Sequence, residues 1–274
     1  MLKKKKRLFR LIVIGFTLLS LVAWFLVNSS QKRVEIDFLD VGQGDASLIK
    51  LPNSKTILID GGPDNIVLKR LGENLPFYQR RIDLIILSHP HDDHIIGLLE
   101  IIRRYKVGAI IYVGKEENPE LLTLLLATAE SKNISLTDLK DEASINYSPT
   151  CSVHLLNPES LKIKEDGNNS IVTKLDCDSF TTLFSGDNSS AVEATLLKTK
   201  YNWSAGVFKA SHHGSKTANS EAFLRAVKPS VFVVSVGVDN RFGHPNPEVL
   251  ERVERLKIDI KRTDKMGTIR VFGS

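Results

Sequence analysis

The chain has 274 residues, of which 42% are hydrophobic and 25% are charged, which is the range of an ordinary globular protein with one sizeable core. Its formal net charge of +5 comes from one end, because residues 1–33 hold eight Lys and Arg and no acid. Residues 34–274 carry a net charge of about −3. This balance excludes a domain that binds polyanions through bulk positive charge, so any nucleic-acid affinity needs a local groove.

An apolar segment follows a basic run at the start of the sequence. Residues 3–7 are all basic, and the 17 residues 11–27 carry no charge. A helix of that length spans about 25 Å, near the shortest that crosses a bilayer core. We expect residues 1–33 to form a cytoplasmic tail, one transmembrane helix and a linker, with residues 34–274 on the outer face of the cell membrane. A cleaved signal peptide is the alternative, although the sequence after residue 27 fits a cleavage site poorly.

Short strands are expected next. Residues 34–39 alternate with period two, residues 46–51 and 56–59 are two further strands, and glycines lie between them. A helix is expected over residues 66–74, and the apolar strand 82–87 leads into a histidine-rich loop.

Strands and helices remain mixed in the rest of the chain. The expected strands are 109–113, 153–156, 171–175, 181–184, 206–210, 231–236 and 268–272, and the expected helices begin near residue 93 and cover 119–131, 189–200, 220–227 and 247–256. Strands that are apolar on both sides require helices outside the sheets. We therefore predict an α/β fold, with residues 34–274 forming one domain in which two mixed sheets pack together in a four-layer αββα sandwich.

The loop Ser88-His89-Pro90-His91-Asp92-Asp93-His94 contains three of the seven histidines and two carboxylates. Imidazole is the commonest protein metal ligand and a carboxylate adds a hard oxygen, so this spacing lets one loop offer ligands to two adjacent ions. The sequence therefore predicts a metal site. Asp60, the Ser185-Gly186-Asp187 motif and the Ser211-His212-His213-Gly214-Ser215 motif also follow apolar strands, and we expect them to converge on the same site.

Together these motifs resemble the metallo-β-lactamase-fold hydrolases. Four further segments narrow the resemblance to the ComEC-type branch, which is named for a DNA-uptake channel protein; they are Phe38-Leu39-Asp40-Val41-Gly42-Gln43-Gly44-Asp45-Ala46, Asn169-Ser170, His212-His213-Gly214-Ser215 and Phe242-Gly243-His244-Pro245. The resemblance covers nearly all of residues 34–274. It is more specific for the fold and the metal centre than for the substrate.

The resemblance implies a centre with one or two divalent ions, zinc or manganese. His89 and His91 would hold the first ion, Asp93 and His94 the second, and Asp187 would bridge them. A carboxylate suits this bridge because its two oxygens can contact separate ions about 3.5–4 Å apart.

The ligand that completes the second site is ambiguous between two neighbours. The sequence does not decide between His212 and His213, because adjacent residues in an extended segment point in opposite directions. We favour His212, and His213 would then line the pocket. Many relatives place another histidine before the bridging aspartate, but His154 lies within an apolar strand and is interpreted as a core or strand-face residue. The first ion would then keep an open position, as catalysis requires.

Other polar residues are expected around the centre. Asp60 would accept a proton from a ligand imidazole and so aim it, while Asp45 and Asn169 are placed in the pocket. Besides Asp93, two groups are expected to act in catalysis: His244, which would supply a proton to the leaving group or contact the substrate, and Lys209, which would hold a phosphate.

The two cysteines, Cys151 and Cys177, could pair in an oxidising compartment, but their contexts favour separate thiols. The resemblance implies metal-dependent hydrolysis of a phosphodiester, with DNA as the substrate at the outer face of the membrane. A separate DNA-uptake channel is the expected partner. The alternatives are an envelope phosphodiesterase that acts on a teichoic-acid or phosphocholine group, and a membrane-tethered scaffold without catalysis.

Overall fold

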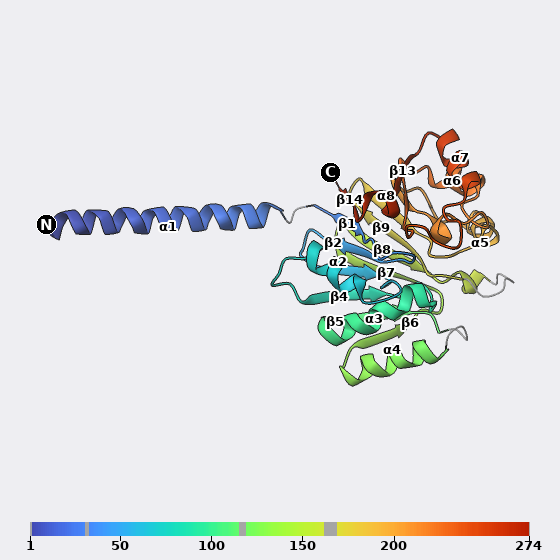
Figure 1. Cartoon of the computed structure of the whole chain (residues 1–274), viewed down its shortest axis with the longest axis horizontal. Helices are drawn as coiled ribbons and strands as arrows, with labels where there is room; N and C mark the ends of the chain where they lie inside the picture. Colours follow the sequence, from blue (N-terminus) through green and yellow to red (C-terminus); the bar gives the residue numbers. More distant parts are fainter. Residues whose placement is uncertain (1, 31–32, 115–118, 162–168, 274) are drawn as a thin grey trace.

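The computed structural model describes residues 2–30, 33–114, 119–161 and 169–273. A long helix, α1 (Leu2–Ser30), extends away from a folded domain (Figure 1). Residues 4–24 of α1 are long and apolar enough to cross a membrane, and this segment is 0% buried. The expected apolar helix is therefore present.

Two seven-stranded sheets form the centre of the domain. The first sheet has the order β14-β1-β2-β3-β4-β5-β6, and the second has the order β13-β12-β11-β10-β9-β8-β7. The strands of the first sheet are β1 (Glu35–Phe38), β2 (Ser47–Lys50), β3 (Thr56–Ile59), β4 (Arg81–Ile86), β5 (Lys106–Tyr112), β6 (Ser135–Asp138) and β14 (Ile269–Phe272). Those of the second are β7 (Glu142–Ser148), β8 (Cys151–Leu156), β9 (Val172–Cys177), β10 (Phe180–Phe184), β11 (Val207–Lys209), β12 (Val231–Val234) and β13 (Asp259–Arg262).

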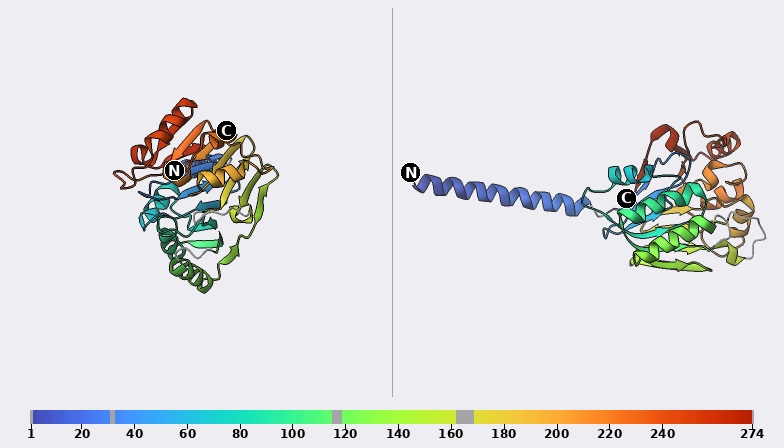
Figure 2. Two further views of the ribbon diagram at one scale, coloured as in Figure 1. Left: turned by 90° about the vertical axis from the view of Figure 1, so that its right-hand side faces the viewer. Right: turned by 60° about the horizontal axis from the view of Figure 1, so that its bottom comes forward.

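Helices cover the outer face of each sheet (Figures 1 and 2). The first sheet is covered by α2 (Ile66–Asn74), α3 (Asp92–Arg104) and α4 (Pro119–Ser131), and the second by α5 (Ser190–Leu196), α6 (Glu221–Val227) and α7 (Pro247–Arg255). The short elements are η1 (Pro158–Leu161), η2 (Ser211–Gly214) and α8 (Thr263–Met266). Between the sheets lies a core that includes Ile36, Phe38, Val153 and Phe184. The structure thus confirms the four-layer αββα prediction.

Strand direction places one end of each sheet at the site. β3 pairs in parallel with β4, so that Ile59 lies beside Ile86, and β10 pairs in parallel with β11, so that Phe184 lies beside Lys209. Because all four strands end at the same edge, the polar segments that follow them meet there. This edge carries the site.

The expectation of two separate thiols was wrong. Cys151 and Cys177 lie directly opposite each other on the antiparallel strands β8 and β9, and the structure joins them in a disulfide. Cross-strand register brought them together, and the spacing of two cysteines in sequence does not reveal register.

Candidate metal centre

The histidine loop connects β4 to α3 and is held by Asp60, the residue after β3. One Asp60 oxygen accepts hydrogen bonds from the Ser88 backbone N–H (2.7 Å), and the other from the Ser88 hydroxyl (2.8 Å). The second oxygen also lies 2.9 Å from Nδ1 of His94. This contact fixes the orientation of the imidazole and leaves its Nε2 aimed into the site.

Three polar atoms at the centre are buried and have no hydrogen-bond partner among the described residues. They are Nε2 of His89, Nε2 of His94 and Oδ1 of Asp187. The His94 nitrogen lies 3.6 Å from Asp187 Oδ1, and the His89 nitrogen lies 3.8 Å from Asp187 Oδ2. Ligand atoms about 2.1 Å from one tetrahedral ion are separated by about 3.4 Å. Since unsatisfied buried polar atoms are costly, this group fits a metal ion.

A second group of metal-compatible atoms shares His94. It contains Asp93 and His213, and Nε2 of His213 lies 3.1 Å from Oδ2 of Asp93. His212 lies beside the Asp187 carboxylate, with its Nε2 3.7 Å from Asp187 Oδ2. Both neighbouring histidines therefore face the site.

The premise that residues 212 and 213 are extended was wrong. Both have positive φ, 48° and 52°, within η2, so their side chains do not alternate. His213 is fixed by a contact of 3.0 Å between its Nδ1 and the Ser235 carbonyl oxygen. This geometry favours His213 as the partner of Asp93 and His94, and His212 as a neighbour of Asp187.

His91 lies at the rim of the centre, with its ring centroid 4.3 Å from that of His89. It lies outside the tight clusters of potential ligand atoms among the described residues. His154 does not take part in the centre. It is exposed on β8, and its ring nitrogens contact the hydroxyls of Ser144 and Ser152. His154 therefore occupies a strand face and not the core.

Electrostatics show how strongly the centre attracts positive charge. Burial lowers the pKa of His94, but the carboxylates of Asp187 and Asp60 outweigh it and raise that pKa well above the ordinary value. Burial also opposes charge on His213, whose pKa is nevertheless raised to about 10 by Asp45 and Asp187. Burial raises the pKa of Asp187, but His94 and His213 lower it well below its usual range. A divalent ion bound here would replace these protons.

Lys209 does not face the open pocket, contrary to the expected phosphate contact. Its side chain is buried and donates hydrogen bonds to Oδ2 of Asp45 (2.6 Å) and to the Ala210 carbonyl oxygen (2.9 Å). The other Asp45 oxygen lies 3.3 Å from Nδ1 of His213. Lys209 thus neutralises a carboxylate that supports the histidine, and two of its hydrogen bonds are made within the domain.

Ser170 was missed as a supporting residue, whereas its neighbour Asn169 was expected in the pocket and is buried nearby. The Ser170 hydroxyl accepts a hydrogen bond from the Asp187 backbone N–H (2.9 Å) and lies 3.2 Å from Nδ1 of His89. The Asn169-Ser170 pair was the available signal. Glycine at residue 186 allows Ser170 to approach this closely, because a Cβ there would lie 2.3 Å from Cβ of Ser170.

A pocket of about 490 Å³ opens over the centre. Its lining includes His91, Asp93, Asp187, His212, His213, Gln43, Arg241, Phe242 and His244. The His244 ring stacks on Phe242 at 6.0 Å and lies 5.7 Å from the ring of His212. Burial and the neighbouring histidines lower the pKa of His244, which keeps it neutral near pH 7. A neutral imidazole suits a substrate contact better than proton donation.

Comparisons with known proteins agree with this geometry. A family model described as the metallo-beta-lactamase superfamily matches residues 39–238. ComE operon protein 3 of Bacillus subtilis is 26% identical, over 89% of this chain and 34% of its own length. Recombination protein 2 of Haemophilus influenzae is 30% identical, over 94% of this chain and 31% of its own length. The chain thus spans about a third of these curated relatives, which are ComEC-type competence proteins. The metallo-beta-lactamase fold protein YhfI of Bacillus subtilis superposes with a TM-score of 0.58, at 10% identity, over 88% of this chain and all of that one.

Proposed function

Because the chain belongs to the metallo-beta-lactamase superfamily, we propose that it is a membrane-anchored, metal-dependent phosphodiesterase that cleaves DNA. Residues 1–33 would anchor it, and residues 34–274 would form the catalytic domain outside the cytoplasm. The observation that carries the proposal is the convergence of three buried, unpartnered ligand atoms, on His89, His94 and Asp187, beneath an open pocket.

The residues of the chain divide the work in this proposal. His89, His94 and Asp187 would hold the first ion, or share two ions with Asp93 and a histidine of η2. Divalent ions supply Lewis acidity and make water a nucleophile at neutral pH. His91 and His244 line the pocket at positions from which each could contact a phosphate oxygen. No serine or cysteine nucleophile is required.

DNA is supported as substrate by the competence proteins among the relatives. A separate channel would then deliver or receive the DNA. The net negative charge of residues 34–274 supports the second candidate, an envelope phosphodiesterase acting on teichoic-acid or phosphocholine groups. A scaffold without catalysis is disfavoured because the site keeps unsatisfied buried ligand atoms.

A comparison of substrates tests the proposal. The full chain in detergent would be loaded with zinc or manganese and assayed on single-stranded DNA, plasmid DNA and a small phosphodiester, beside His91→Ala and the matched histidine control His154→Ala. We expect DNA cleavage by the parent and by His154→Ala, and a loss of at least tenfold in His91→Ala. Cleavage of only the small ester would favour the envelope enzyme. A protein that binds no metal would contradict the mechanism, and a fully active His91→Ala variant would contradict a contact between His91 and the phosphate.

A further inference from the structure

One edge of the domain, opposite the metal centre, combines exposed aromatic and basic side chains. We call it the anchor edge, and it consists of Arg33, Lys55, Phe77, Tyr78, Arg80 and Lys106, all exposed. Strand direction puts it there: β3 and β4 begin at this edge and end at the metal centre. Arg81 lies beside Lys106 in the β4–β5 register, and the Lys106 N–H donates to the Arg80 carbonyl oxygen.

The aromatic part of the anchor edge protrudes from the connection between α2 and β4. Phe77 is 87% exposed and Tyr78 is 64% exposed, and their rings contact each other edge to face at 5.4 Å. Two adjacent large apolar rings in contact with water form an unusual surface feature on a domain with a well-packed core. Aromatic side chains of this kind are enriched at the level of lipid headgroups.

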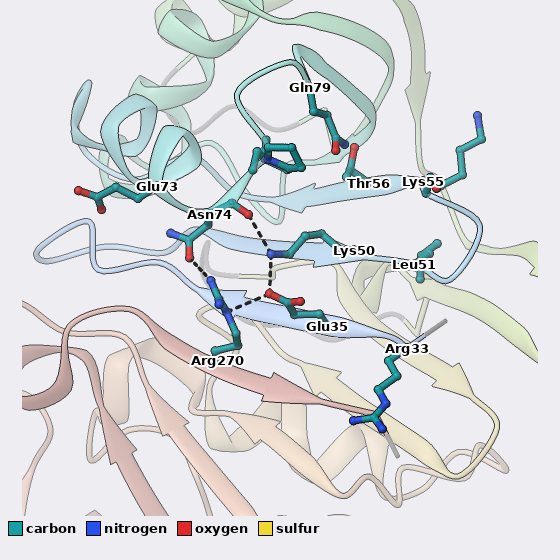
Figure 3. A pocket seen from close by; sticks show the side chains of 13 residues that line it. Arg33, Glu35, Lys50, Leu51, Lys55, Thr56, Glu73, Asn74, Gln79 and Arg270 are labelled. Atoms are coloured by element: carbon teal, nitrogen blue, oxygen red, sulfur yellow. Dashed lines mark hydrogen bonds and ion pairs between the residues drawn. The ribbon is translucent and has the colours of Figure 1, made fainter. Parts of the chain in front are cut away.

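Two basic residues of the anchor edge, Arg33 and Lys55, line a pocket, shown in Figure 3. Lys50 and Arg270 point into it and meet Glu35, at 2.6 Å from Lys50 Nζ and 2.9 Å from Arg270 Nε. Their charges are therefore paired with Glu35, although the Arg270 side chain is 43% exposed. Arg33 and Lys55 extend away from Glu35 toward the outside of the pocket (Figure 3). Lys55 pairs with Asp83 at 3.1 Å but keeps 49% of its side chain exposed, so positive charge remains at this surface although residues 34–274 are acidic in sum.

The chain holds this edge near α1. Three Cα–Cα steps separate Ser30, the last residue of α1, from Arg33, and they reach at most about 11 Å. Figure 1 shows α1 on the side of the domain where β1, β2 and α2 lie. If α1 spans a bilayer, the anchor edge lies at or close to its surface.

We propose that the anchor edge docks on the anionic lipid surface around α1, with Phe77 and Tyr78 in the headgroup layer and the four cations against lipid phosphates. This inference rests on the membrane anchor of the proposed function. Docking would hold the domain upright, so that the metal centre at the opposite edge faces away from the membrane. A substrate would then reach the pocket from the aqueous side.

A fluorescent probe tests the contact in the full chain. Phe77→Cys would be labelled with an environment-sensitive dye, which is selective because both native cysteines are joined in the disulfide. The control is Val238→Cys, an exposed apolar position (69%) that follows β12 at the metal-centre edge. In vesicles of phosphatidylcholine and phosphatidylglycerol, a quencher attached to the lipid headgroups should quench the dye at position 77 and not at 238. Equal quenching at the two positions overturns the proposal.

Charge supplies the second arm of the test. Each cation near an anionic surface contributes to the free energy of binding to that surface. Lys106→Gln, which removes one cation, should therefore lower the ratio of docked to free domain about fivefold. Lys140→Gln is the matched control, because Lys140 is 78% exposed on the turn after β6, near the other edge. Quenching that persists unchanged in pure phosphatidylcholine overturns anionic lipid as the partner. A dye at position 77 that is shielded from aqueous iodide but not quenched by lipid indicates a protein partner and also overturns it.

Failure of the anchor itself has a different signature. Alkaline extraction separates a peripheral protein from a membrane-spanning one, so release of the full chain from the vesicles would contradict the transmembrane anchor. A chain that stays with the vesicles while the position 77 dye remains unquenched contradicts only the docking of the anchor edge.

Discussion

Asp60 positions His94 although it touches no substrate. It has positive φ (60°), is almost fully buried, and accepts hydrogen bonds from the backbone and side chain of Ser88 beside its contact with His94. The Ser88 contacts fix the carboxylate, and the carboxylate fixes the imidazole. Positioning of this kind affects how tightly the ligand binds metal.

Asp60→Asn is therefore expected to weaken divalent metal binding by about 10–100-fold while the fold is kept. The amide has the same shape but lacks the charge that favours the correct tautomer of His94. Competition with a chromogenic chelator would measure the affinity. Asp64→Asn, an exposed turn residue of the same loop, is the control and should bind as the parent does. Unchanged affinity in Asp60→Asn would show that Asp60 has no positioning role.

Lys209 and Asp45 form a buried ion pair whose disruption should be costly. Lys209→Met leaves the Asp45 carboxylate buried without the cation that lies 2.6 Å from it, and we expect a loss of about 3–5 kcal/mol in the free energy of unfolding. The double variant Asp45→Asn/Lys209→Met removes both charges and should lose less. Urea unfolding of the parent, both single variants and the double variant would measure the coupling. Additive losses would contradict the ion pair.

At the residue scale, the sequence predicted which side chains gather but not how each is used. His89, His94 and Asp187 could be named because each follows an apolar strand. The role of Lys209 was wrong, since its partner Asp45 lies 164 positions away in sequence and no local pattern reveals a partner at that distance. Ser170 was part of the Asn169-Ser170 motif, but its supporting role was missed because the contacts of a serine hydroxyl are not visible in sequence.

At the element scale, buried strands were predictable, whereas among the edge strands of the described residues β14 was expected and β6, β7 and β13 were not. β4 has an apolar pattern and was expected, whereas β7 alternates between exposed and half-buried positions and was missed. β13 was also missed, because its four residues are exposed or half-buried at the end of the second sheet. Edge strands lack the continuous apolar run that identifies a strand with neighbours on both sides.

Close packing of α3 sets the position of the histidine loop. Gly97 of α3 donates its backbone N–H to the Gly62 carbonyl oxygen, and the backbone carbonyl oxygen of His94 accepts a hydrogen bond from the N–H of Gly61. A Cβ on Gly97 would lie 1.9 Å from the Gly61 carbonyl oxygen. The helix can approach the loop this closely only because residue 97 is glycine.

Gly97→Ala should push α3 away from Gly61, and we expect a loss of about 1–3 kcal/mol in stability together with weaker metal binding. Gly72→Ala is the matched control: Gly72 also lies in a helix, α2, but a Cβ there meets nothing within 4 Å. Alanine should stabilise that helix by about 0.5–1 kcal/mol and leave metal affinity unchanged. Chemical unfolding and metal titration of both variants distinguish the two effects, and equal behaviour would contradict close packing at Gly97.

At the scale of the whole molecule, the candidate centre joins the two halves of the sandwich. The histidine loop follows β4 of the first sheet, whereas Asp187 and η2 follow β10 and β11 of the second. An ion held by both groups would act as a cross-link between sheets that otherwise meet through their apolar core. Carboxylates from both sheets would repel each other more strongly without it.

Removal of the metal should therefore destabilise the whole domain and not only abolish activity. At a free metal concentration 100 times the dissociation constant, binding contributes about 2.7 kcal/mol, which corresponds to a decrease in Tm of roughly 5–10 °C when a chelator is added. Thermal unfolding of the metal-loaded full chain, with and without chelator, measures this. Asp187→Asn weakens a ligand that lies 3.6 Å from His94, of the first half, and 3.7 Å from His212, of the second, so its Tm should respond little to the chelator. If the parent responded as little as Asp187→Asn, the ion would not be linking the two sheets, and their association would depend on the apolar core alone.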